Sequence, residues 1–289
     1  MVNSMANLLV NFKTLDGTIH NNITVAEFLD AKFDVSQLSE EDQIKREAIN
    51  IIYDLNGDES KLFDRFPDRE HPLLFDFIQG ANGQDTNGHY DPKTHAINLK
   101  NPSADDGYAS LTRKQKIALL VGTYAHEMKH CQQFDKNLAQ MLNQILSGQV
   151  ADGWATHQLR YLSEAQAHAF GGYVYHKAFG NADFLKDGNE ENYEAHKDQY
   201  DTIIALYQKY GQGEEYKNVE KDLIVAWLDI LYEGTAKGYR DSYHRSTIVK
   251  ESDQGIREIP PEFRLQKDDI QPIMDKLKNA PKTPTKRRL

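Results

Sequence analysis

The chain has 289 residues, of which 39% are hydrophobic and 27% are charged, and its formal net charge is -10. A chain of this length can bury a full core, and one main domain with additions is favoured over two equal halves. The negative charge argues against binding to phosphate backbones or anionic lipid, because both need a basic surface, so we expect no nucleic-acid partner.

The chain has one cysteine, Cys131, which excludes an internal disulfide bond and a metal site made from cysteine pairs. We expect its thiol to be buried as a small hydrophobic group. No stretch reaches the roughly 18 apolar residues of a membrane span, and the N-terminus lacks the features of a signal peptide. We therefore expect a soluble protein with no membrane span, either cytoplasmic or secreted without an N-terminal signal peptide.

Residues 1–72 are predicted to form an N-terminal addition made of a strand and two helices. Residues 7–13, "NLLVNFK", are typical of a short strand. Thr24 and Glu27 have the spacing of a capping box, which predicts a helix from Thr24 onward. Ser39 stands before an acidic first turn, which indicates the start of a second helix.

Residues 73–99 differ in character, because apolar or alternating runs are separated by Asn-Gly, Asp-Pro and Gly turn signals. We expect strands and hairpins in this segment. The sequences "GHY" at 88–90 and "HAINL" at 95–99, joined by "DPKT", predict a hairpin directly before the central helix.

The central helix is predicted to begin at a second capping box, formed by Thr112 and Gln115, and to end at Gly148. Its apolar positions recur at helical spacing and predict one buried face. The members of this face in the first half of the helix are Ile117, Leu120, Val121, Tyr124, Ala125 and Met128.

More helices are predicted after this one, and the first of them, at 155–179, has small residues on one side. The others are expected at about 190–210, 216–233 and 268–278. We assign residues 73–245 to the main domain.

Residues 246–289 are predicted to form a C-terminal extension that ends in a basic tail. The tail, "NAPKTPTKRRL" at 279–289, has a composition typical of disorder. It could be a solubilising tail, or an address read by a secretion or import machine.

The central helix contains the sequence His126-Glu127-x-x-His130, which has the spacing of a zinc site. Residues four apart project from one face of a helix, so two imidazole nitrogens can reach one ion. Zinc lowers the pKa of bound water toward about 7, and a carboxylate at Glu127 could take the proton of that water. The alternative is a buried helix whose histidines make ordinary hydrogen bonds.

The segment "AHEMKH" at 125–130 resembles the zincin metallopeptidases, and the likeness extends from about residue 73 to residue 175. It is most similar to the glutamate-zincin (gluzincin) type, as in small bacterial metallopeptidase domains. The resemblance implies a zincin-like α+β fold, in which a small twisted sheet with an edge strand packs on the motif helix. A second helix would carry a ligand, further helices would follow, and "GHY" or "HAINL" would bind a substrate backbone by strand addition.

Two other zincin types are excluded because this chain lacks their ligands. A metzincin needs histidine where this chain has Lys136, and an aspartate-zincin needs aspartate where "GTAKGY" has Lys237. The glutamate-zincin resemblance implies a third ligand on the second helix, and Glu164 in "SEAQAH" fits that position.

Other third ligands stay open. His168 stands where the resemblance implies an acidic residue that orients a zinc-bound histidine, so it remains a candidate ligand together with His157. Asp152 and Glu191 are further candidates. The histidines at 71, 89, 95, 176 and 196 have no partner pattern and are expected to be surface or packing residues.

A hydrolase of this kind also needs a donor for the oxyanion of its tetrahedral intermediate. Tyr175 is one candidate, because it lies on the helical stripe of Glu164 and His168. His244, in a cluster with Tyr239 and Tyr243, is the other. Packing is an alternative role for each of these tyrosines.

Together these residues predict a zinc-dependent peptidase that holds one Zn2+ and hydrolyses a protein or peptide substrate. His126, His130 and Glu164 would bind the ion, and Glu127 would act as general base and acid. One alternative is a non-catalytic scaffold stapled by zinc, and another is a secreted effector protease that cleaves one specific protein. The sequence does not indicate the substrate or the oligomeric state.

Overall fold

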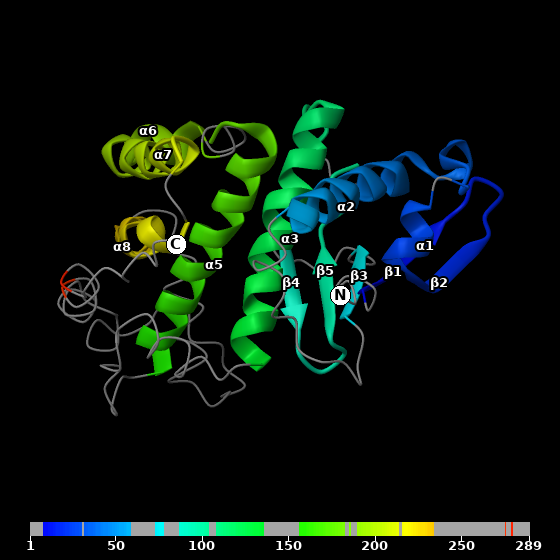
Figure 1. Cartoon of the computed structure of the whole chain (residues 1–289), viewed down its shortest axis with the longest axis horizontal. Coiled ribbons are helices and arrows are strands. Elements are labelled where there is room, and N and C mark those ends of the chain that lie inside the picture. Colours follow the sequence, from blue (N-terminus) through cyan, green and yellow to red (C-terminus); the bar gives the residue numbers. More distant parts are fainter. Residues whose placement is uncertain are drawn as a thin grey trace, which may run out of the picture. The chain divides into compact units, whose positions relative to one another are not determined.

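A computed structural model of the chain describes residues 8–30, 32–58, 73–77, 87–103, 108–135, 156–182, 185, 190–213, 216–233, 275 and 279. Its strands and helices, shown in Figure 1, give the predicted α+β class. The strands are β1 Leu8–Lys13, β2 Ile19–Thr24, β3 Leu73–Phe77, β4 Gly88–Asp91 and β5 Ala96–Leu99. The helices are α1 Val25–Leu29, a 3-10 turn Val35–Gln37, α2 Glu40–Asp58, α3 Arg113–Asp135, α5 Thr156–Phe179, α6 Glu190–Ala195, α7 Lys197–Gly211 and α8 Tyr216–Glu233.

The chain forms two compact units. The first comprises Met1–Asp135 and Val174–Gly180, and the second comprises Lys136–Tyr173 and Asn181–Leu289. Helix α5 contributes its last turn and a half to the first unit and its earlier turns to the second. It is nevertheless one continuous helix.

The first unit contains a five-stranded mixed sheet with the order β2-β1-β3-β5-β4. Strands β1, β3 and β5 are parallel to one another, whereas β2 and β4 pair antiparallel with their neighbours. The predicted strand at 7–13 and the predicted hairpin of 88–99 are both confirmed. Among the described strands β4 lies at one edge of the sheet, so the edge candidate is "GHY" and not "HAINL".

Helices α2 and α3 cover the same face of this sheet. Phe75 and Phe77 of β3 are two residues apart, so both side chains point to one face. The Phe75 ring packs edge-on against Tyr124 of α3 with 4.6 Å between ring centroids, and the Lys45 amine of α2 lies 4.3 Å from the Phe77 centroid. The motif helix is therefore seated directly on the sheet.

Helix α3 begins at the predicted capping box. The Thr112 N–H donates to Gln115 Oε1 at 2.9 Å, and the Gln115 N–H donates to Thr112 Oγ1 at 3.3 Å. These bonds satisfy two of the donors that a helix start leaves free. The predicted continuation of this helix over 136–148 lies outside the described residues.

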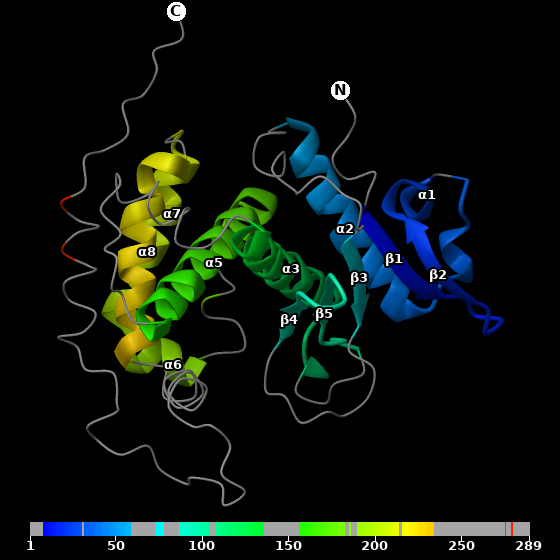
Figure 2. The same cartoon turned by 90° about the horizontal axis from the view of Figure 1, so that it is seen from below.

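The second unit is helical in its described residues, and helices α7 and α8 pack side by side (Figure 2). The Tyr207 hydroxyl of α7 donates to the Ala169 carbonyl of α5 at 3.1 Å, and it accepts the indole N–H of Trp227 in α8 at 3.3 Å. Aromatic side chains thus connect α5 to α7 and α7 to α8.

Two predictions for the later helices need comment. The single helix expected at about 190–210 divides at His196, where α6 ends and α7 begins. The helix expected at 268–278 and the basic tail lie outside the described residues, apart from Asp275 and Asn279. Within the part of the chain that the structure describes, no helix has the length and apolar character that crossing a membrane requires.

Candidate metal centre

The two motif histidines on α3 point their ring nitrogens at each other. His126 Nε2 and His130 Nε2 are 3.0 Å apart, and the ring planes are inclined by 75°. Two nitrogens that share one zinc ion at tetrahedral geometry are separated by roughly 3.3 Å, given zinc–nitrogen bonds of about 2.0 to 2.1 Å. The pair is therefore already close to the spacing that a shared ion requires.

Burial fixes which side of α3 presents these histidines. Tyr124, Ala125 and Met128 are at most 3% exposed, and they form the predicted face against the core. His126 and His130 are only partly buried. Cys131 is fully buried, as predicted, so its thiol belongs to the packed side of the helix.

The carboxylate of Glu127 lies beside the histidine pair. Its Oε1 is 4.0 Å from His126 Nε2, which is beyond hydrogen-bond distance. The side chain is only 7% exposed, so few water molecules can reach it. Two polar atoms at this distance could both contact one water molecule placed beside them.

Gln133 makes a contact to the motif that the sequence did not predict. Its Oε1 lies 2.9 Å from Nδ1 of His130, the ring nitrogen that faces away from His126. Gln133 is 3% exposed. The signal was present in the sequence, because residues three apart on a helix are neighbours.

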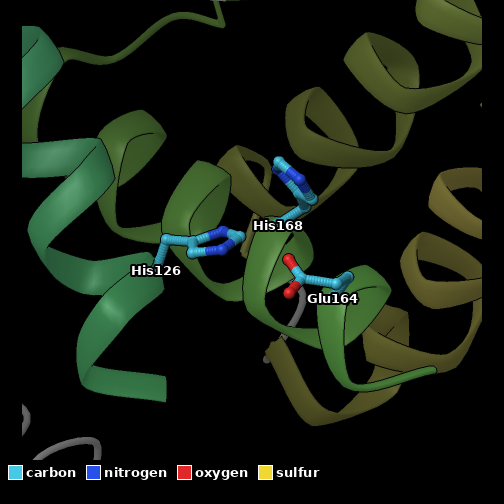
Figure 3. A group of neighbouring side chains, drawn as sticks. All are labelled: His126, Glu164 and His168. Atoms are coloured by element: carbon cyan, nitrogen blue, oxygen red, sulfur yellow. The ribbon is translucent and has the colours of Figure 1, made fainter. Parts of the chain in front are cut away.

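Helix α5 supplies the other candidate ligands. His126, Glu164 and His168 each offer one ligand atom, and these three atoms all lie within 4.8 Å of one another. Figure 3 shows the three side chains, with His126 coming from one helix and Glu164 and His168 from the next. Glu164 and His168 are four residues apart and so share a helix face. This group of donors could hold a metal ion.

The ring of His168 is held by the second unit. It stacks on the indole of Trp227, with 4.6 Å between ring centroids and 17° between the planes. The Tyr207 hydroxyl accepts the Trp227 indole N–H and donates to the carbonyl of Ala169, the residue that follows His168 in α5. Sequence reasoning could not predict this support, because α5 and α8 are separated in the chain.

The remaining sequence-predicted residues are placed as follows. Tyr175 is 6% exposed, packs against Phe179 with 4.8 Å between centroids, and lies in contact range of Gly122 on α3. His157 and Glu191 lie on α5 and α6. The other candidates lie outside the described residues: Asp152, Tyr239, Tyr243 and His244.

Histidines outside the motif have other surroundings. His95 Nδ1 lies 2.9 Å from the Tyr90 hydroxyl in the hairpin, and His89 Nε2 lies 3.5 Å from the amide nitrogen of Asn98. His176 is 7% exposed, and burial lowers the pKa of its imidazole below the ordinary 6.5. The ligand group found among the described residues contains none of these three.

The edge strand β4 packs closely on the motif helix. A Cβ atom built on Gly88 would lie 3.0 Å from Cγ2 of Thr123, so the strand backbone approaches α3 at this point. Thr123 is three residues before His126, and residues at that spacing are neighbours on a helix. The edge of the sheet therefore runs beside the turn that carries the first motif histidine.

Comparison of the chain with protein-family models, with curated proteins and with solved structures gives no match. The inference of function therefore depends on the motif and on the geometry around it.

Proposed function

We propose that this protein is a zinc-dependent peptidase of the glutamate-zincin type. The observation that carries the proposal is the convergence of His126 Nε2 and His130 Nε2 at 3.0 Å, with the buried carboxylate of Glu127 4.0 Å from the first of them. An ordinary hydrogen bond between the imidazoles also accounts for the 3.0 Å separation, but it does not account for the buried carboxylate beside the pair. An enzyme that activates water needs all three groups.

The donor set suits zinc. His126, His130 and Glu164 would hold the ion through two imidazole nitrogens and one carboxylate, a set typical of catalytic zinc sites. When bound there, zinc would polarise a substrate carbonyl and lower the pKa of a water molecule. Glu164 forms one group of donors with His126 and His168, and this placement supports its assignment as a ligand. His130 is not part of that group, and its assignment depends on its Nε2 lying 3.0 Å from that of His126.

Glu127 would be the general base. Its carboxylate is too far from His126 for a direct hydrogen bond, but close enough to accept a proton from a water molecule that contacts both groups. The same carboxyl group would then pass that proton to the leaving amine. Its burial supports this role, because a proton-transfer group works best where bulk water is excluded.

The substrate would bind along β4. This strand is antiparallel to β5, forms an edge among the described strands, and packs on α3 through Gly88. An extended peptide that pairs with β4 would lie beside the turn of His126. These features support strand addition to β4 as the mode of substrate binding.

The decisive experiment compares proteolysis by the wild type and by Glu127→Gln, with new protein N-termini mapped in treated lysates. Glu127→Gln removes the base but keeps the side-chain size, so we expect a loss of cleavage with zinc binding retained. Glu194→Gln, an equal change at an exposed position of α6, is the matched control and is expected to cleave normally. Unchanged cleavage by Glu127→Gln would contradict the proposal.

A second function deserves testing because His168 is an additional nitrogen donor near His126. If His126, His130, Glu164 and His168 all bound the ion, the site would be four-coordinate and closed, as in structural zinc sites. The protein would then be a zinc-stapled scaffold that binds a partner.

His168→Phe separates the two proposals, because phenylalanine keeps a ring to stack on Trp227 but provides no donor. The peptidase proposal expects zinc affinity and cleavage to be largely retained. The scaffold proposal expects zinc affinity to fall more than about 100-fold, since losing a ligand costs more than losing a supporting hydrogen bond. X-ray absorption spectra of the zinc-loaded wild type would count the protein ligands directly.

A further inference from the structure

The two nitrogens of the His130 ring have different neighbours. Nε2 faces His126 Nε2 at 3.0 Å, and Nδ1 faces the side-chain oxygen of Gln133 at 2.9 Å. A neutral imidazole carries one proton, so one nitrogen is a donor and the other offers a lone pair. Only the nitrogen with the lone pair can bind a metal ion.

The neighbour at Nδ1 decides which nitrogen keeps its proton. An amide oxygen can only accept a hydrogen bond, so its presence at Nδ1 requires the proton to be there. Nε2 then presents its lone pair on the side of His126. With the amide turned over, its nitrogen would donate to Nδ1 and the proton would move to Nε2, where it would block a metal.

Burial makes this preference strong. Gln133 is 3% exposed, so water cannot easily replace the amide as the hydrogen-bond partner of Nδ1. Both residues lie on α3, three positions apart, so the contact needs no other part of the fold to form it.

We propose that Gln133 is a positioning residue that holds His130 in the tautomer with the proton on Nδ1 and the lone pair on Nε2, which is the form that can bind a metal ion. This inference rests on the proposed zinc site, and it adds a neutral amide as the group that orients the second motif histidine. A neutral acceptor polarises the imidazole less than a carboxylate does, so His130 is a weaker electron donor than a histidine paired with an acid.

Three substitutions test the proposal. Gln133→Met keeps an unbranched side chain of similar length but removes the amide oxygen. Gln133→Glu keeps an acceptor at the same distance and strengthens it. Gln132→Met is the matched control, because Gln132 is also buried, at 6% exposed, but residues two apart on a helix do not face each other.

Two measurements are needed, and the first uses the metal-free protein. Nitrogen-15 NMR of the imidazoles at about pH 8, above the ordinary histidine pKa of about 6.5, reports the tautomer of His130. The second measurement is the dissociation constant for Zn2+, obtained by competition with a chelator. Circular dichroism would verify that each variant is folded.

We expect the wild type and Gln132→Met to show the Nδ1–H tautomer, and Gln133→Met to show a mixture. Gln133→Met should bind Zn2+ about 10- to 100-fold more weakly, and Gln133→Glu at least as tightly as the wild type. An Nε2–H tautomer in the wild type would overturn the proposal. Equal losses in Gln132→Met and Gln133→Met would also overturn it, because they would indicate a general packing effect.

The outcome also separates this inference from the proposed function. If the wild type fails to bind Zn2+ while Gln133→Met changes the tautomer, the metal site is wrong and the positioning role of Gln133 is right. If Zn2+ binds tightly and Gln133→Met changes neither measurement, the site stands and the role of Gln133 is wrong.

Discussion

The two helices that carry the candidate ligands, α3 and α5, are held in place by different interactions. On α3 the paired histidines, the buried Glu127 and the supporting Gln133 all lie within eight residues, and a local capping box starts the helix. On α5 the ring of His168 is held by Trp227, which is 59 positions further along the chain. The candidate residues on α3 are thus positioned by local geometry, whereas the ring of His168 on α5 is positioned by tertiary packing.

The largest expected effect tests the dependence of α5 on its neighbours. Trp227→Ala removes a buried indole that stacks on His168 and donates to Tyr207. Loss of a buried tryptophan costs about 3 to 5 kcal/mol, so we expect a decrease of this size in the free energy of unfolding. Urea unfolding followed by circular dichroism measures it.

Trp227→Phe is the control for this substitution, because it keeps an aromatic ring for His168 and should cost clearly less than Trp227→Ala. A loss below about 1 kcal/mol in Trp227→Ala would show that the aromatic cluster does not hold α5.

A smaller effect is expected where the sheet approaches α3. In Gly88→Ala the new Cβ would lie 2.6 Å from Cδ2 of Leu99, which is fully buried, and 3.0 Å from Cγ2 of Thr123. Overpacking of this kind costs about 1 to 3 kcal/mol. We also expect β4 to move away from the motif helix, with weaker cleavage as a result.

Gly122→Ala is the matched comparison on α3, because among the described residues its Cβ would meet only Tyr175, at 3.7 Å. Alanine is favoured over glycine inside a helix by about 0.8 to 1 kcal/mol, so this variant should be more stable than the wild type. Thermal unfolding of Gly88→Ala and Gly122→Ala is the test. If both substitutions raised the stability, or both lowered it, the close approach at Gly88 would be contradicted.

The local start of α3 is tested by Thr112→Ala. This change removes the hydroxyl that accepts the Gln115 N–H, and such a loss costs about 1 kcal/mol. Thr112→Ser keeps the hydroxyl and should be close to the wild type in urea unfolding. Equal stability of the alanine variant would mean that packing on the sheet alone fixes where the helix begins.

The smallest effect concerns His176, in the part of α5 that belongs to the first unit. Burial holds the pKa of its imidazole below 6.5 in the folded protein, so below that pH the unfolded chain binds the proton first. Stability contributed by the neutral ring is therefore lost as the pH falls from about 6.5 toward the folded pKa. Urea unfolding of His176→Asn should show a shallower decline below that pH, and an equal decline would contradict this account.

The sequence predicted the features that depend on short-range spacing. These include the strand at 7–13, both capping boxes, the hairpin before α3, the buried face of α3 and the α+β class. The same reasoning brought His126 and His130 together, because the pitch of a helix fixes the relation of residues four apart.

Other features could not be predicted because long-range contacts determine them. The parallel pairing of β1 with β3 joins residues 65 positions apart, such as Leu8 and Leu73, and no periodicity in either strand specifies that partner. The division between α6 and α7 at His196 has no glycine or proline to signal it. The stack of Trp227 on His168 likewise follows from how α5 and α8 pack, which composition alone does not reveal.

The form of β4 also bears on self-association. An exposed strand edge is a template on which other copies can aggregate, and proteins limit this by keeping edge strands short or by ending them with proline. Strand β4 has four residues and is followed at once by Pro92, while the Asp91 carboxylate accepts the Lys93 N–H at 2.9 Å to close the turn. Such a short edge, ended by proline, offers few backbone groups on which a second copy of the chain could pair.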